Sequence, residues 1–189
     1  GGNAEVAQTS RNTLKIWEMA GAKIPVASGA ESPLLSSLNT APLVHGDDGL
    51  GNTFLPAPKG TPSEESATDM ILRLSHQHAG EMTLLTTAPL TNLGAALLHD
   101  STLAGRIRNL VCMGGAVFTG NVSAVAEANI YNDPEAARIV FRSGIEITMI
   151  GLDVTHKVYW EESDLQPLED AGNEHADFLL QIIRFISGA

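Results

Sequence analysis

The sequence is dominated by four short apolar runs that alternate with stretches of helical pattern. The runs are rich in β-branched and aliphatic residues and cover residues 24–28 (IPVAS), 82–87 (MTLLTT), 109–115 (NLVCMGG) and 145–151 (IEITMIG). Strands separated by helix-sized segments are typical of βαβ units, in which the strands are parallel. We therefore predict an α/β fold with an open, mostly parallel sheet, helices on both of its faces, and one domain over residues 1–189.

Start and stop signals predict where the main helices lie. Residues 5–21 show helical spacing of apolar side chains and end at Gly21, a residue that is free to adopt positive φ. The sequence TPSE at residues 61–64 predicts a helix start with a capping box, and Asp133 followed by proline predicts another start. Asn173 is predicted to cap a last helix close to residue 189.

Composition argues against several classes of partner and site. The formal net charge of −11 and the pI near 4.8 repel nucleic-acid phosphates and anionic membranes. No apolar run is long enough to span a bilayer, and the first residues lack the order of a signal peptide. Cys112 is the only cysteine, so one chain can form neither a disulfide nor a thiolate zinc cluster. The sequence predicts a cytoplasmic protein with no nucleic-acid or membrane partner.

Polar and glycine residues gather where the predicted strands end. Thr87 ends the run that starts at residue 82, Gly114 and Gly115 end the next, and Asp153 follows the last. Carboxyl ends of parallel strands meet at one edge of a sheet, which is where ligands bind in such folds. We therefore predict a site at this edge, with Asp153 supporting the end of its strand.

A second polar group lies in the segment GNVSAVAEANIYNDPEAA, where Asn121, Glu127 and Asn129 fall close together. Sugar hydroxyls both donate and accept hydrogen bonds, so amide and carboxyl side chains suit them. The same side chains also stabilise turns by bonding to nearby backbone. From the residue types alone, sugar binding and a capped turn both remain open.

Five segments, in one order along the chain, carry a family pattern. They are residues 2–21, 44–51, 86–97, 113–137 and 151–157, and the succession MGG, GN and AEANIYNDPEAA is the most specific part. Together they resemble the inosine-uridine preferring nucleoside hydrolases. The resemblance implies hydrolysis of the N-glycosidic bond of ribonucleosides to ribose and free base, by calcium-activated water and without a covalent enzyme intermediate.

The resemblance also implies roles for residues of the sugar pocket. Asn121, Glu127 and Asn129 match family residues that bind the ribose hydroxyls. Met113 matches a methionine that lines the sugar pocket, although a methionine at the end of an apolar strand more often serves core packing.

Three further positions match the nucleobase and metal parts of the family site. His45 matches a histidine beside the base, and Asn3 matches an asparagine near the metal and the ribose, with a helix cap as the alternative reading. The backbone carbonyl of Thr87 matches a calcium ligand.

The family's aspartate cluster, which precedes the first helix, and its later histidine and aspartate have no counterpart in this sequence. We therefore expect a partial domain, truncated at both ends, and assign no catalytic base. Two alternatives stay open, a noncatalytic ribose- or nucleoside-binding module and a structural remnant acting as an oligomer subunit. An unpaired sheet edge and the apolar stripe around Ile182 and Ile186 predict a homo-oligomer.

Overall fold

The computed structural model describes residues 2–188, which divide into two compact units. The sheet unit comprises residue 2, residues 27–39 and residues 64–158, and the helical unit comprises residues 3–26, 40–63 and 159–188. Each unit is built from several separate stretches of the chain, so neither unit corresponds to one continuous segment of sequence. The expectation of one domain over residues 1–189 therefore stays a prediction.

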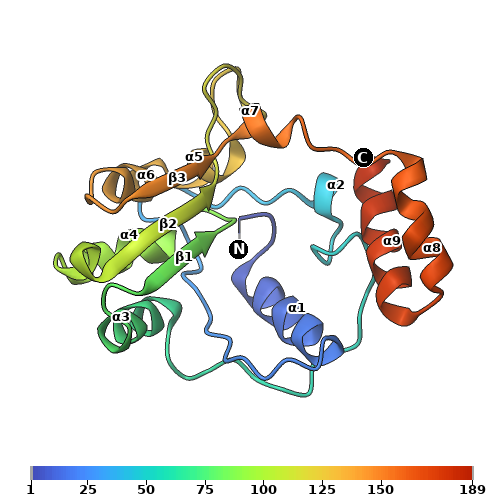
Figure 1. Ribbon diagram of the computed structural model, residues 1–189, viewed down its shortest axis with the longest axis horizontal. Coiled ribbons are helices and arrows are strands. Elements are labelled where there is room, and N and C mark those ends of the chain that lie inside the picture. The colour runs from blue at the N-terminus through green and yellow to red at the C-terminus, as the bar shows by residue number, and fades with distance from the viewer. Residues whose placement is uncertain (1, 189) are drawn as a thin grey trace. The chain divides into compact units, whose positions relative to one another are not determined.

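The sheet has three parallel strands in the order β1-β2-β3 (Figure 1). Their bounds are Met82–Thr86 (β1), Ile107–Met113 (β2) and Ile147–Ile150 (β3). Leu84 pairs with Leu110 and Leu110 with Ile147, so these three side chains share one face. Three of the four predicted strands are confirmed, and with them the α/β class and the open parallel sheet.

The predicted strand at residues 24–28 is wrong. Only Ala27 makes an isolated bridge there, and the rest of the run is irregular. Pro25 has no N–H to donate to a ladder, and Ile24 is 56% exposed. This apolar run therefore lacks the paired neighbours that make β-structure stable.

The helical elements of the sheet unit, except the last one, contribute side chains to the core on the face that Leu84, Leu110 and Ile147 share. The elements are α3 (Ala67–Gln77), α4 (Thr91–His99), η1 (Leu103–Arg106), α5 (Ala128–Asn132), α6 (Pro134–Phe141) and α7 (Leu152–Thr155). Leu110 belongs to the same core cluster as buried residues of α4 and α6, and Leu84 and Ile147 pack against that cluster. A Cβ built on Gly94 of α4 would lie 2.9 Å from the Cβ of Ala136 in α6, so these two helices approach closely.

Helix starts follow the predicted signals in one case and not in the other. The α6 helix starts as expected, because Asp133 accepts the Ala136 amide at 3.0 Å and Pro134 occupies the first turn. The predicted cap at residues 61–64 is wrong, since α3 begins at Ala67 and its cap is the hydroxyl of Ser66. Ser63 instead donates its amide to the carbonyl of Val26 and forms an isolated bridge, which is followed by a bend.

An irregular segment at residues 34–39 is fixed to the start of α6 by buried polar groups. The amide of Leu34 donates to Asp133 Oδ2 at 2.9 Å. Ser36 Oγ donates to the carbonyl of Asn132 at 2.8 Å, and the amide of Asn39 donates to Asn132 Oδ1 at 2.9 Å. Asp133 is 0% exposed. The segment is thus ordered by side chains more than 90 positions away rather than by its own secondary structure.

The helical unit contains α1 (Val6–Met19), α2 (Pro42–His45), η2 (Glu162–Leu165), α8 (Gln166–Ala171) and α9 (Glu174–Ser187). Asn173 caps α9 as predicted, and Gly21 follows α1 with a φ of 65°. The ring of His175 lies 2.8 Å from the carbonyl of Met19, which joins the start of α9 to the end of α1. None of the helices described in residues 2–188 is long and apolar enough to cross a membrane.

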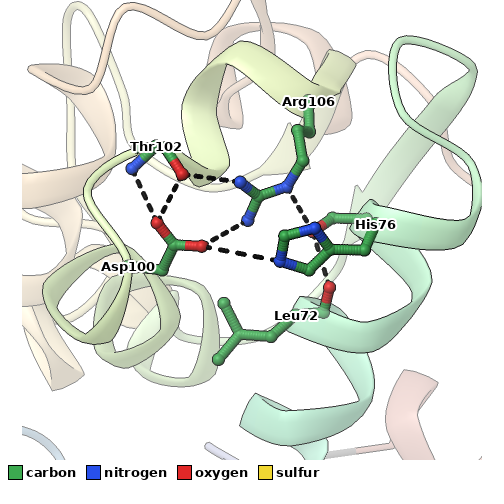
Figure 2. A network of polar contacts seen from close by, with 6 residues as sticks. Leu72, His76, Asp100, Thr102 and Arg106 are labelled. Carbon is green, nitrogen blue, oxygen red and sulfur yellow. Dashed lines mark hydrogen bonds and ion pairs between the residues drawn. The ribbon is translucent and has the colours of Figure 1, made fainter.

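A polar network braces the amino end of β2 (Figure 2). Asp100 Oδ2 lies 2.6 Å from Arg106 Nη2, and Arg106 also donates to the hydroxyl of Thr102 at 2.6 Å and that of Ser75 at 3.1 Å. His76 Nε2 approaches Asp100 Oδ2 at 3.8 Å. The Thr102 hydroxyl and the Arg106 guanidinium hold the pKa of Asp100 well below its usual value. The network therefore links α3, the end of α4 and η1 through one ionised carboxylate.

Candidate functional site

The side chain of Asn129 brings the carboxyl ends of β1 and β2 together. It lies in the first turn of α5 and is 8% exposed. Its Nδ2 donates to the Met113 carbonyl at 3.0 Å, lies 3.3 Å from the Met113 sulfur, and lies 3.5 Å from the Thr87 carbonyl. Met113, Thr87 and Asn129, all predicted from the sequence, thus meet at the predicted edge of the sheet.

Glu127 is the N-cap of α5 and braces the turn after β2. Its carboxylate accepts the amide of Gly115 at 2.8 Å, of Asn129 at 2.9 Å and of Ile130 at 3.1 Å. The residue is 3% exposed. A carboxylate has about four acceptor positions, and among residues 2–188 only the Asn129 amide donates to Oε1. The capping interpretation therefore accounts for most of the contacts of Glu127, with room for one more donor on Oε1.

Asn121 is exposed and sits in the loop of residues 116–126, which leads from β2 toward α5 (Figure 1). Its Oδ1 accepts the Ala128 amide at 3.0 Å. The amides of Asn121 and Val122 both donate to the Ala126 carbonyl, at 3.1 Å each, which closes the loop on itself. Among the residues that the structure describes, no partner is seen for Asn121 Nδ2, which leaves this donor open to a ligand.

Asp153 contributes a contact that the sequence did not predict in detail. Its Oδ2 accepts the Val117 amide at 2.7 Å, and its Oδ1 accepts the Phe118 amide at 3.3 Å. The hydrogen bond from Val117 lowers the pKa of Asp153. The signal available in the sequence was an acidic residue directly after a strand end, which indicated support of the strand but not of a distant loop.

Asn3 and His45 belong to the helical unit and are described within it. The Asn3 carbonyl accepts the amide of Ala41 at 2.9 Å, and the N-cap position of α1 is Glu5. The helix-cap reading of Asn3 is therefore wrong. His45 ends α2, is half-buried, and has a pKa lowered by burial.

The calcium site implied by the family resemblance stays a prediction, and the described residues supply few candidate ligands for it. Calcium takes about six to eight oxygen ligands, usually including several carboxylates. Within residues 2–188, no three histidine, cysteine, aspartate or glutamate side chains are grouped so that they could hold a metal ion. Thr87 supplies one carbonyl, which already lies 3.5 Å from Asn129 Nδ2. In the acidic pair at residues 47 and 48, the carboxylate of Asp48 accepts the amides of Leu50 and Phe54 and so stabilises the turn.

Comparison with known proteins identifies the family of the chain. The family model described as inosine-uridine preferring nucleoside hydrolase matches residues 1–189. A probable uridine nucleosidase 1 from Oryza sativa subsp. japonica is 41% identical over 187 residues, covering 97% of this chain and 58% of that protein. The pyrimidine-specific ribonucleoside hydrolase RihA of Salmonella paratyphi B is 38% identical over 185 residues, covering 97% of this chain and 60% of that protein.

Solved structures give the same result. A purine-preferring ribonucleoside hydrolase from Gardnerella vaginalis superposes with a TM-score of 0.94 at 34% identity, covering 98% of this chain and 60% of that one. The chain thus spans about three fifths of the length of these relatives. With the family model matching over the full sequence, the chain belongs to the inosine-uridine preferring nucleoside hydrolase family.

Proposed function

We propose that the protein takes part in hydrolysis of the N-glycosidic bond of ribonucleosides, releasing ribose and a free base. The observation that carries this proposal is the polar group at the carboxyl ends of β1 and β2, where Asn129 and Glu127 are held rigidly and Asn121 has an open donor. Relatives named for pyrimidine and for purine substrates both resemble the chain, so we propose no base preference.

In this reaction a water oxygen bonds to C1′ of the ribose and gives up one proton, while the bond from C1′ to the base nitrogen breaks. The electron pair goes to the nitrogen, which takes up a proton as the base leaves. The chain's own residues bind and orient the sugar. Asn121 Nδ2 can donate a hydrogen bond to one sugar hydroxyl, and Glu127 Oε1 can accept a hydrogen bond from another.

We also propose calcium as a cofactor, with the Thr87 carbonyl as one of its ligands. The family resemblance supports this, whereas the described residues supply too few ligands by themselves.

A noncatalytic ribose-binding module is the second candidate. It is favoured by the combination of an ordered sugar-type cluster with the lack of a metal-binding group among residues 2–188. In that case the chain would bind ribose or nucleoside and leave the glycosidic bond intact.

Reducing-sugar release from uridine and inosine, with and without added calcium, separates the two candidates. The same purified sample is checked by intact mass, and binding of D-ribose is measured by calorimetry. Calcium-dependent release supports the hydrolase. Binding of ribose without release supports the module, and neither binding nor release contradicts both.

Self-association and location are further proposals. Leu179 and Ile186 of α9 are partly exposed, which supports a homo-oligomer. Sedimentation velocity tests it, and a monomer at all concentrations would contradict it. A cytoplasmic location stays a prediction from charge and cysteine content.

A further inference from the structure

The loop of residues 116–126 is fixed to the sheet unit by carboxylates on two sides. Glu127 accepts the amide of Gly115, directly before the loop, at 2.8 Å. Asp153 accepts the amides of Val117 and Phe118, at 2.7 and 3.3 Å. Asp153 lies in α7, which follows β3, so its contact joins the connection after β3 to the loop after β2.

The backbone places Asp153 beside the loop. The amide of Leu152 donates to the Gly115 carbonyl at 2.9 Å. A Cβ built on Gly151 would lie 2.9 Å from the same carbonyl oxygen, so only glycine permits this approach without a shift. Asp153 therefore follows a point where the two connections already touch, and its carboxylate needs little freedom to reach the two amides.

The loop is internally closed, so it is expected to move as one piece. The Ala126 carbonyl accepts the amides of Asn121 and Val122, and Asn121 Oδ1 accepts the Ala128 amide. Val117 and Phe118 side chains are exposed and pack little against the unit. The backbone amides of these two residues are thus the means by which the first half of the loop is held.

We infer that Asp153 is a positioning residue for ribose binding, which holds the loop of residues 116–126 so that Asn121 presents its Nδ2 to the sugar. The inference rests on the proposed function and adds a residue to its site. Asp153 is assigned this role through the loop, because each of its carboxylate oxygens accepts a backbone amide of the loop.

The test compares the variants Asp153→Asn and Asp100→Asn with wild type. Asparagine keeps one acceptor, so one of the two amides held by Asp153 loses its partner. We expect the dissociation constants of D-ribose and uridine to rise by about tenfold. Amide hydrogen exchange at Val117 and Phe118 should also become faster. Asp100→Asn makes the same side-chain change at the amino end of β2, where it weakens the fold without touching the loop.

Each outcome decides the inference. Weaker binding and faster exchange in Asp153→Asn, with wild-type affinity in Asp100→Asn, support it. Unchanged affinity in Asp153→Asn overturns the inference and leaves the proposed function standing. Equal losses in both variants also overturn it, because affinity then follows stability alone. If wild type binds neither D-ribose nor uridine, the proposed function fails and the inference fails with it.

Discussion

Replacing Asp133 by asparagine should destabilise the protein strongly, although the two side chains have almost the same shape. The carboxylate is 0% exposed and receives three donors: the Leu34 amide at 2.9 Å, the Thr91 hydroxyl at 2.6 Å and the Ala136 amide at 3.0 Å. The first two bond to Oδ2 and the third to Oδ1. One side chain thus joins the segment of residues 34–39, α4 and the start of α6.

The magnitude follows from what an amide can accept. If the asparagine oxygen takes the place of Oδ2, its NH₂ group faces the Ala136 amide. If it takes the place of Oδ1, the NH₂ group faces the Leu34 amide, while the Thr91 hydroxyl can turn to accept. Either way one buried N–H loses its acceptor, at a cost of about 1–3 kcal/mol. The bonds that remain lose the strength that a charge gives them, about 1 kcal/mol more. We expect the free energy of unfolding to fall by about 2–4 kcal/mol.

Urea unfolding followed by circular dichroism measures this change from the shift of the midpoint at a common slope. The matched control is Asp69→Asn, because Asp69 is exposed and its carboxylate accepts the Ser66 hydroxyl at 2.7 Å. Its effect should stay below about 1 kcal/mol. If Asp133→Asn lowers the free energy of unfolding by no more than the control does, the reasoning that one buried carboxylate joins three parts of the unit is refuted.

Three further predictions concern the site, the packing of helices and the response to acid. Asn129→Ala should weaken D-ribose binding by about 1–3 kcal/mol, measured by calorimetry, and unchanged affinity would contradict its role in the site. Gly94→Val should lower the free energy of unfolding, measured by urea titration, by about 1–3 kcal/mol, since its Cβ would lie 2.9 Å from that of Ala136. Gly105→Ala should be nearly neutral, because a Cβ at that position has no neighbouring atom within 4 Å. Asp100 has a lowered pKa in the folded state, so its contribution is present above its ordinary value of 3.8 and is lost as the pH falls further. The urea midpoints at pH 5 and pH 3 should therefore differ less in Asp100→Asn than in wild type. Equal differences in the two proteins would contradict a stabilising contribution from ionised Asp100.

The sheet could be predicted because its signals are local. The runs that became β1, β2 and β3 are apolar and follow helix-sized segments, and each found a neighbour in register. The run at residues 24–28 has a similar composition, yet it lacks a paired neighbour over its length. Strand formation depends on a partner elsewhere in the chain, which composition does not reveal. The predicted cap at residues 61–64 was wrong because it too depended on a distant partner. The amide of Ser63 donates to the carbonyl of Val26.

The roles of the candidate site residues stay predictions, but the structure shows which of them lie together. Asn129 contacts Met113 and Glu127, which the sequence pattern assigns to the same sugar pocket. That the Glu127 carboxylate is mostly occupied by backbone amides depends on how the chain turns after β2, which no spacing in the sequence encodes. The contact of Asp153 with Val117 depends in turn on the approach of two strand ends.

The anchors of residues 34–39 limit how the length of this segment can vary among related sequences. An ordinary surface loop tolerates insertions because its backbone amides bond to water. Here the amides of Leu34 and Asn39 bond to side chains at positions 133 and 132, and the Ser36 hydroxyl fixes a point between them. One inserted residue between these anchors would pull at least one of them out of reach. Insertions should therefore collect on either side of the segment, even though its lack of helix or strand makes it look like a tolerant loop.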